Sequence, residues 1–175
     1  MKNGYTLLEL LIVIGLTVIL LITATSLFFT TFIGGGKTAS AEYTKQAGQN
    51  ALNQMTYLIR NARKLTTNVA GQTCAGSMDS IGLINQDGGT TVLQLDSSGK
   101  IASNSGIFLT PTDLSVVNGA FDFTCSPTNY GTDQWDGSPP RITISFSLQK
   151  GVNGVDKARD IVTIPFQSTI TMRNY

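Results

Sequence analysis

Residues 10–33 read LLIVIGLTVILLITATSLFFTTFI, and these 24 residues carry no formal charge. As an α-helix that rises about 1.5 Å per residue they would span roughly 36 Å, whereas the hydrocarbon core of a bilayer is about 30 Å thick. A cleaved secretory signal has a shorter apolar run of about 7–15 residues, followed by a small-residue cleavage site. Here Gly34-Gly35-Gly36 follows instead. We therefore predict a retained helix that spans a membrane.

Charges on either side of this segment do not by themselves set its orientation. Lys2 precedes it, which favours a cytoplasmic N-terminus. Lys37 and Lys45 follow it and argue weakly for the opposite orientation.

One acidic residue, Glu9, stands where the apolar segment begins. A carboxylate near the centre of a bilayer costs about 2.5–3.5 kcal/mol, and less towards the interface. Two interpretations stay open. Glu9 can lie at headgroup level, where a negative charge stabilises a helix N-terminus, or it can pair with a cation supplied by another chain.

The leader sequence supplies a family resemblance. Residues 2–9, KNGYTLLE, and the apolar run behind them resemble type IV prepilins, in which a short basic leader ends in Gly and is followed by an aromatic residue and by Glu as the fifth mature residue. Tyr5 stands where the family usually has Phe. The resemblance implies that a prepilin peptidase cuts between Gly4 and Tyr5 and methylates the new Tyr5 amine.

The same resemblance implies a life cycle and a role for Glu9. A precursor sits in the cytoplasmic membrane with its head outside the cytoplasm. An inner-membrane assembly platform and a separate ATPase then draw it into an extracellular or periplasmic filament. Glu9 lies four residues after Tyr5, about 6 Å along a helix. In stacked subunits its carboxylate can meet the Tyr5 amine of a neighbour and so set the register, because an unpaired buried charge costs several kcal/mol.

A second helical pattern covers residues 37–66. Its apolar residues recur in steps of three and four, which predicts an amphipathic helix. They are Ala47, Ala51, Met55, Leu58, Ile59, Ala62 and Leu65. We expect this stripe to pack on the C-terminal part of the same chain rather than on a partner. The predicted helix covers residues 5–66, with its membrane-spanning part at 5–33.

Glycines weaken this helix at two places. Gly48 lowers helix stability by roughly 1 kcal/mol relative to Ala, and so does each of Gly34, Gly35 and Gly36. We expect a break or hinge at the triplet that lets the head reorient during assembly. A plain linker is the alternative.

Residues 67–175 form the predicted head. Short β-type runs alternate there with Gly, Asn, Asp and Ser clusters. The candidate strands are 80–85, 90–96, 107–110, 114–117 with 120–124, 141–148 and 161–172. The predicted fold class is therefore α+β, with a long N-terminal helix packed on an antiparallel sheet. Pro165 is expected at a sheet edge or bulge because it has no N–H to donate.

Parts of the head also resemble W-type minor pilins and J-type pseudopilins. The matching stretches are 109–116, 121–123, 141–144 and 169–175. They are built of common residues, and they imply a minor subunit rather than the main subunit of a fibre.

Cys74 and Cys125 are the only cysteines in the sequence. Outside the cytoplasm an even count suggests a disulfide, here closing a loop of roughly 52 residues with about 4 kcal/mol of stabilisation. Two free buried thiols are the alternative.

Little in the sequence supports catalysis or metal binding. There is no His, so imidazole bases, Ser-His-Asp triads and His metal ligands are excluded. Asn129, Asp133, Asp136 and Gly137 share a loop that can offer oxygen ligands to Ca²⁺, but their spacing fits no complete calcium loop and any turn uses such residues. Trp135 in that loop is either an exposed tip or folded back. We predict no metal, no cofactor and no enzyme.

Charge separates the stem from the head. Residues 37–66 hold five basic residues and one acidic residue, and residues 67–175 hold six basic and nine acidic residues. This asymmetry either steers lateral contacts between subunits or forms a solvated face. Arg60, Arg63 and Lys64 can touch DNA phosphates, but no aromatic residues interleave with them and the head is acidic, so we expect no direct nucleic-acid binding.

The expected function is a structural subunit, of the minor kind, in a type IV pilus or a related filament. Its expected partners are other pilin subunits, the prepilin peptidase, the assembly platform and membrane lipid. A type II secretion pseudopilin is the first alternative. The second is a membrane-tethered binding domain that never polymerises.

Overall fold

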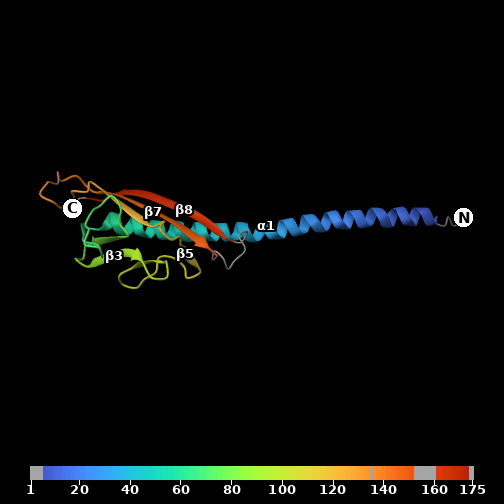
Figure 1. The fold of residues 1–175 in the computed structure, drawn as a ribbon, viewed down its shortest axis with the longest axis horizontal. Helices are drawn as coiled ribbons and strands as arrows, with labels where there is room; N and C mark the ends of the chain where they lie inside the picture. The colour runs from blue at the N-terminus through green and yellow to red at the C-terminus, as the bar shows by residue number, and fades with distance from the viewer. Residues whose placement is uncertain (1–5, 135, 152–160, 174–175) are drawn as a thin grey trace. The chain divides into compact units, whose positions relative to one another are not determined.

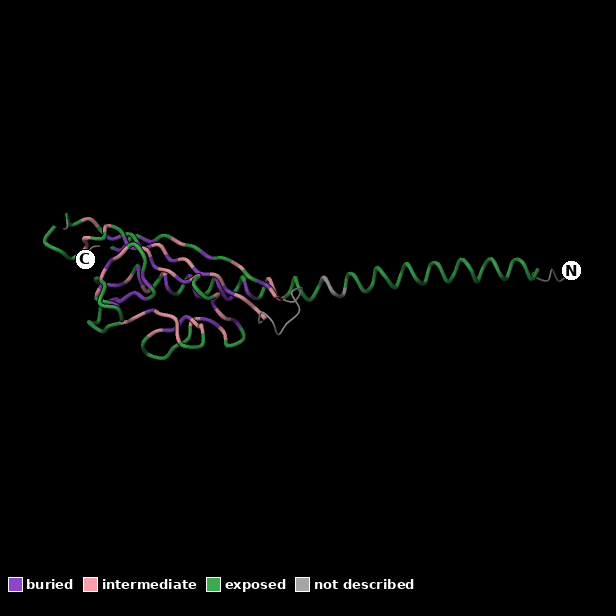
Figure 2. The backbone as a smooth tube through the Cα atoms, viewed as in Figure 1, coloured by how far each residue is buried: buried purple, intermediate pink, exposed green. Residues whose placement is uncertain are grey.

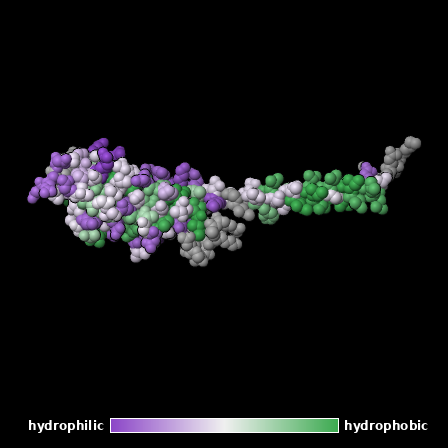
Figure 3. Space-filling model, turned by 45° about the horizontal axis from the view of Figure 1, so that its top comes forward, coloured by the Kyte–Doolittle hydropathy of each residue, from purple (hydrophilic) through white to green (hydrophobic). Residues whose placement is uncertain are grey.

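The first element is helix α1, which spans Leu7–Asn61 (Figure 1). The computed structural model describes residues 6–134, 136–151 and 161–173, which fall into two compact units, 1–39 and 40–175. Within the first unit every side chain described from 6 to 31 and from 35 to 39 is exposed (Figure 2). Hydrophobic side chains cover most of this stretch (Figure 3). The helix is long and apolar enough to cross a membrane.

Two details of α1 differ from the sequence-based expectation. The helix continues through residues 34–36, so the expected break is absent, and a mechanical hinge there stays a prediction. It also ends at Asn61, not at residue 66. Arg63 N donates to Ile84 O at 2.7 Å, and residues 64–66 form a strand. The i, i+3 spacing of Ala62 and Leu65 fitted a helix, but pairing with a neighbouring strand satisfies this backbone instead.

The second unit contains two antiparallel sheets of four strands each. The first has the order β1-β2-β3-β4 and consists of β1 (Lys64–Thr66), β2 (Ser80–Ile84), β3 (Thr90–Leu95) and β4 (Ile101–Ser103). The second consists of β5 (Leu114–Val116), β6 (Asp122–Ser126), β7 (Arg141–Lys150) and β8 (Val162–Thr171). In the second sheet β5 and β6 pair with different parts of β7, and β8 pairs with it along ten residues.

The two sheets are joined by main-chain hydrogen bonds at two places. Near one junction Phe123 N donates to Met78 O at 2.9 Å. At the other, Val116 N donates to Gly99 O at 2.8 Å. The α+β class is therefore confirmed, with two linked sheets where one was expected.

The apolar stripe of α1 packs into the core of the second unit, as expected. Ala47, Ala51, Met55 and Ile59 are buried in one cluster with residues of both sheets, and Leu58 packs against it. In Figure 1, β7 and β8 run beside this part of the helix. Burial of such side chains contributes about 1.5–3 kcal/mol each for the larger ones, which favours a single packed unit.

Gly48 is required where α1 meets β8. A Cβ at this position would overlap the ring of Phe166, which is buried and stacks on Phe146 with ring centroids 5.1 Å apart. The residue that weakens the isolated helix is thus the one that lets the helix approach the strand.

We expect Gly48→Ala to lower the free energy of unfolding by about 1–3 kcal/mol, because a well-packed ring must shift, although Ala is the better helix former. Urea unfolding followed by circular dichroism measures this. Gly76→Ala is the matched control, because an added Cβ at Gly76 meets nothing within 4 Å. Equal stability of the two variants would contradict the packing role of Gly48.

Of the predicted strands one is absent, and the structure contains two short strands that were not predicted. Residues 107–110 form no strand. The chain turns back towards β4 there, and Leu109 N donates to Ile101 O at 2.8 Å. The short strands β1 and β4 were not predicted, because three residues are too few to show an alternation.

Pro165 lies in β8, which pairs only with β7 among the described strands, so the edge prediction is confirmed. Its partner Ser147 turns its backbone groups towards β5, because Ser147 O accepts from Val117 N at 2.9 Å. The pair Ser147–Pro165 is therefore of the non-hydrogen-bonded kind, and the nitrogen of Pro165 faces the free edge of the sheet.

Candidate functional site

The exposed apolar part of α1 satisfies its own polar side chains. Six hydroxyl groups donate to backbone carbonyls three or four residues earlier, at 2.6–3.2 Å. They belong to Thr17, Thr23, Thr25, Ser26, Thr30 and Thr31. In hydrocarbon each unsatisfied polar group would cost several kcal/mol. This part of the chain is thus suited to an environment without water.

Thr6 caps the N-terminus of α1. Its Oγ1 accepts from Glu9 N at 3.2 Å, and its carbonyl oxygen accepts from Leu10 N at 3.2 Å. Thr6 and Glu9 therefore occupy the N-cap and N3 positions of the capping-box pattern Ser/Thr-x-x-Glu/Gln, of which the bond from Glu9 N to the Thr6 side chain is formed. Sequence reasoning missed this role, although Thr6-Leu7-Leu8-Glu9 contains the signal.

Glu9 stands at N3, where the partial positive charge of the helix terminus favours a carboxylate. Its side chain is exposed and forms no salt bridge with any residue that the structure describes. The predicted cleavage and methylation positions, Gly4 and Tyr5, lie outside the described residues. Both interpretations of Glu9, as a terminus-stabilising charge and as a partner for a cation, remain predictions.

The described contacts show no packing role for Gly35 or Gly36. An added Cβ would meet nothing within 4 Å at Gly35 or at Gly36. Close approach of described residues therefore does not require glycine at these two positions, which leaves conformational freedom as the property that distinguishes them.

If the triplet is a hinge, replacing Gly34, Gly35 and Gly36 together with Ala should stiffen α1, because each substitution favours the helix by about 1 kcal/mol. We expect normal amounts of precursor in the membrane but several-fold less chain in sheared filaments, measured by immunoblot. If the triple variant enters filaments as well as the unmodified chain, the hinge prediction is wrong and the triplet is a plain linker.

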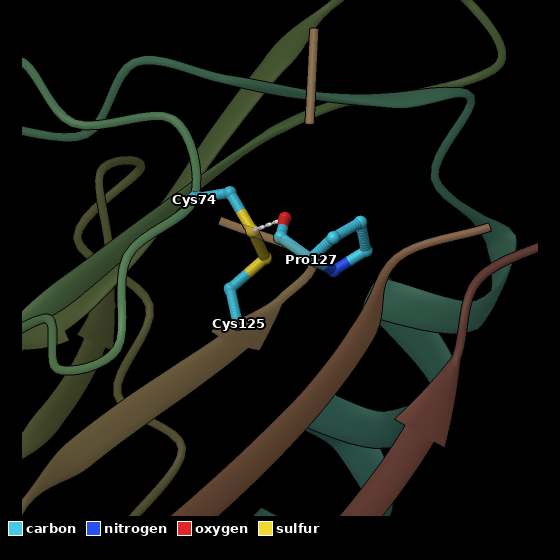
Figure 4. Close-up of a disulfide and its surroundings, with 3 residues drawn as sticks. All are labelled: Cys74, Cys125 and Pro127. Atoms are coloured by element: carbon cyan, nitrogen blue, oxygen red, sulfur yellow. Dashed lines mark hydrogen bonds between the residues drawn. A yellow bond between two sulfur atoms is a disulfide. The ribbon is translucent and has the colours of Figure 1, made fainter. Parts of the chain in front are cut away.

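The Cys74–Cys125 disulfide fastens the first sheet to the second (Figure 4). It joins the segment that leads into β2 to strand β6, where Cys125 N also donates to Ala75 O at 2.8 Å. The carbonyl oxygen of Pro127 lies 3.0 Å from Cys74 Sγ. The expected disulfide is confirmed, and the alternative of two free thiols is wrong.

Asp122 supports the same junction with hydrogen bonds. Its Oδ1 accepts from Ser77 Oγ at 2.6 Å and from Met78 N at 3.0 Å. Its Oδ2 accepts from Thr124 Oγ1 at 3.0 Å. Disulfide and carboxylate thus connect the same two segments by different chemistry. Nothing in the sequence distinguished Asp122 from the other aspartates.

A second polar cluster joins α1 to the second sheet. Tyr43 Oη donates to Asp113 Oδ1 at 2.9 Å, and Lys150 Nζ lies 3.8 Å from Asp113 Oδ2 and 4.7 Å from the centroid of the Tyr43 ring. The hydrogen bond to Asp113 raises the pKa of Tyr43, with smaller contributions from burial and from the Asp113 charge. The phenol therefore stays protonated, and the donor is retained, at physiological pH.

The loop considered for Ca²⁺ uses its polar groups in turns. Asp136 Oδ1 accepts from Ser138 N at 2.9 Å, and Asn129 Nδ2 donates to Gln134 O at 2.8 Å. Hydrogen bonds from Ser138 lower the pKa of Asp136. Within the described part of the chain no three His, Cys, Asp or Glu side chains gather as metal ligands. Trp135 lies outside the described residues.

Comparison with known proteins finds no match to this chain, whether among family models, curated proteins or solved structures. The structure defines an α+β protein with a long apolar N-terminal helix and disulfide-linked antiparallel sheets.

Proposed function

We propose that this chain is a minor structural subunit of a type IV pilus-like filament. It is made as a precursor in the cytoplasmic membrane, is cut between Gly4 and Tyr5 and is methylated on Tyr5. The observation that carries the proposal is a single arrangement at the N-terminus. A short basic leader ending in Gly4 is followed by Glu9 at the capped start of an exposed apolar helix.

Three further observations support this function. The apolar part of α1 keeps its hydroxyl groups bonded to its own backbone, as a helix in lipid or in the apolar core of a filament must. The following part of α1 packs on antiparallel sheets, which gives the α-helix-plus-sheet arrangement expected of a pilin. A disulfide suits a head that faces an oxidising compartment.

The proposed mechanism is mechanical rather than catalytic. Lipid holds the apolar helix until the assembly platform moves the subunit into the filament. Helices of neighbouring subunits then replace lipid around it. In this environment the Glu9 carboxylate pairs with the Tyr5 amine of a neighbour, and the head forms part of the surface.

Mass spectrometry of sheared surface filaments tests the proposal. We expect a chain that begins at N-methylated Tyr5 and is present in a small molar share relative to the main subunit. A strain without prepilin peptidase should instead accumulate the chain with residues 1–4 attached.

Other outcomes would identify the alternatives. Processed chain found only in periplasmic filaments of a secretion system would indicate a type II pseudopilin. Unprocessed chain found only as monomer in membranes would contradict the proposal and indicate a tethered binding domain.

A further inference from the structure

An open groove lies between the C-terminal end of α1 and the turn that joins β2 to β3. Its volume is about 370 Å³, near the lower end of the range of small-ligand sites, roughly 300–1,000 Å³. The lining residues are Tyr57, Leu58, Asn61, Asn85, Gln86 and Asp87. Both walls belong to the second unit, and none of these residues has a role in the proposed assembly of the filament.

Hydrogen bonds fix the turn that forms one wall of the groove. Asn85 N donates to Gly89 O at 2.8 Å, and Gly88 N donates to Asn85 O at 3.1 Å. Gly88 has a φ of +86°, which favours glycine. Asp87 Oδ1 accepts from Gly89 N at 2.9 Å. The wall is therefore preorganised, which lowers the entropy lost on binding.

The polar side chains of the groove are oriented so that oxygen acceptors remain available. Asn61 Nδ2 donates to Tyr57 O at 2.9 Å, and Asn85 Nδ2 donates to Thr91 Oγ1 at 3.0 Å. Each amide thus uses a donor internally and keeps its Oδ1. Asp87 likewise keeps Oδ2, because its internal bond uses Oδ1. Each of these three lining side chains therefore keeps an oxygen acceptor outside its internal hydrogen bond, and the hydroxyl groups of a ligand are donors that match such acceptors.

Tyr57 adds an aromatic surface beside these acceptors. Its side chain is 68% exposed, although it lies on the helix that forms the core of this unit. The face of an aromatic ring carries negative charge density and attracts the weakly positive C–H groups of a flat, partly apolar ligand. Leu58 packs against the core beneath and gives the groove an apolar floor.

We propose that this groove binds a neutral hexopyranose of a glycan. One face of a pyranose is apolar enough to stack on Tyr57, and its hydroxyl groups match the acceptors of Asn61, Asn85 and Asp87. Among the described residues that line the groove Asp87 alone is charged, and its negative charge disfavours an anionic sugar. The volume suits one or two sugar units rather than a long chain. The inference does not depend on filament assembly.

Saturation-transfer NMR on the full chain tests this. The chain is held in phosphocholine micelles, since detergents with sugar headgroups would compete. The probes are the methyl pyranosides of glucose, galactose and mannose, with N-acetylneuraminic acid as the charged comparison. We expect at least one neutral pyranoside to bind saturably, with millimolar affinity, through the C–H groups of one ring face.

Variants connect the signal to the groove. Tyr57→Ala should weaken binding at least tenfold, whereas Tyr57→Phe should keep the stacking ring and most of the affinity. Asp87→Ala should weaken binding several-fold. Val69→Ala is the matched control, since Val69 is also exposed but lies at a different groove. Circular dichroism checks that each variant is folded.

The proposal is overturned if no neutral pyranoside binds, if Tyr57→Ala binds as well as the unmodified chain, or if N-acetylneuraminic acid binds more tightly than every neutral probe.

Discussion

Replacing both cysteines with serine, Cys74→Ser with Cys125→Ser, should lower the free energy of unfolding of the second unit by about 4 kcal/mol. The disulfide closes a loop with a sequence separation of 51 residues, and in the chain-entropy model such a loop restricts the unfolded chain by this amount. Because native domains are stable by only about 5–15 kcal/mol, the loss is a large fraction of the total.

Urea unfolding of oxidised chain, of the double variant and of chain reduced with dithiothreitol measures the effect. The reduced chain and the double variant should unfold at similar urea concentrations, both well below the oxidised chain. Cys125 is 1% exposed, so we expect reduction to be slow until the urea concentration unfolds the chain. A double variant that loses less than 1 kcal/mol would show that Asp122 and the main-chain bonds hold the two sheets together without the disulfide.

Replacing Glu9 should have the largest effect on assembly. We expect Glu9→Leu to remain in the membrane at normal levels but to fall at least tenfold in sheared filaments. If the Tyr5 amine of a neighbour loses its carboxylate partner inside an apolar core, an unpaired charge is left that costs several kcal/mol, and each 1.4 kcal/mol is a factor of ten. Quantitative immunoblots of membrane and filament fractions measure the ratio.

The capping box allows the two roles of Glu9 to be separated. Glu9→Gln keeps a residue that a capping box accepts but removes the charge. Thr6→Ala removes the cap, at a cost of roughly 1 kcal/mol, but keeps the charge. If charge pairing sets the register, Gln fails as Leu does and Thr6→Ala assembles. If instead Glu9→Gln assembles and Thr6→Ala does not, the role of Glu9 is only to stabilise the N-terminus of the helix.

Features carried by a long repeating pattern were predictable from the sequence. The apolar run and the stripe from Ala47 to Ile59 depend on many residues that agree, and one substitution would not hide them. Pairing of Cys74 with Cys125 followed because the chain offers no other partner. The alternation of Arg141–Leu148 likewise predicted most of β7.

Features that depend on contacts between distant segments were not predictable. The helix ends at Asn61 because β2, some twenty residues later, takes over the hydrogen bonds of Lys64–Thr66. The sequence predicted only that Gly48 lowers helix stability, because its contact with Phe166 joins residues that are far apart in the chain. The groove lined by Tyr57 forms because the turn at residues 85–87 packs beside the C-terminal end of α1. Thr6 differs, since its local signal was present and was overlooked.

The position of Pro165 has a consequence for the behaviour of the head in crowded surroundings. An outer strand of ten residues would ordinarily be a template on which foreign chains extend the sheet. Pro165 has a ring in place of the N–H that would face the free edge. The edge of β8 therefore lacks one hydrogen-bond donor near its middle, and the ring sterically hinders the pairing of an added strand. Pro165 therefore lowers the tendency of β8 to pair with a strand of another chain.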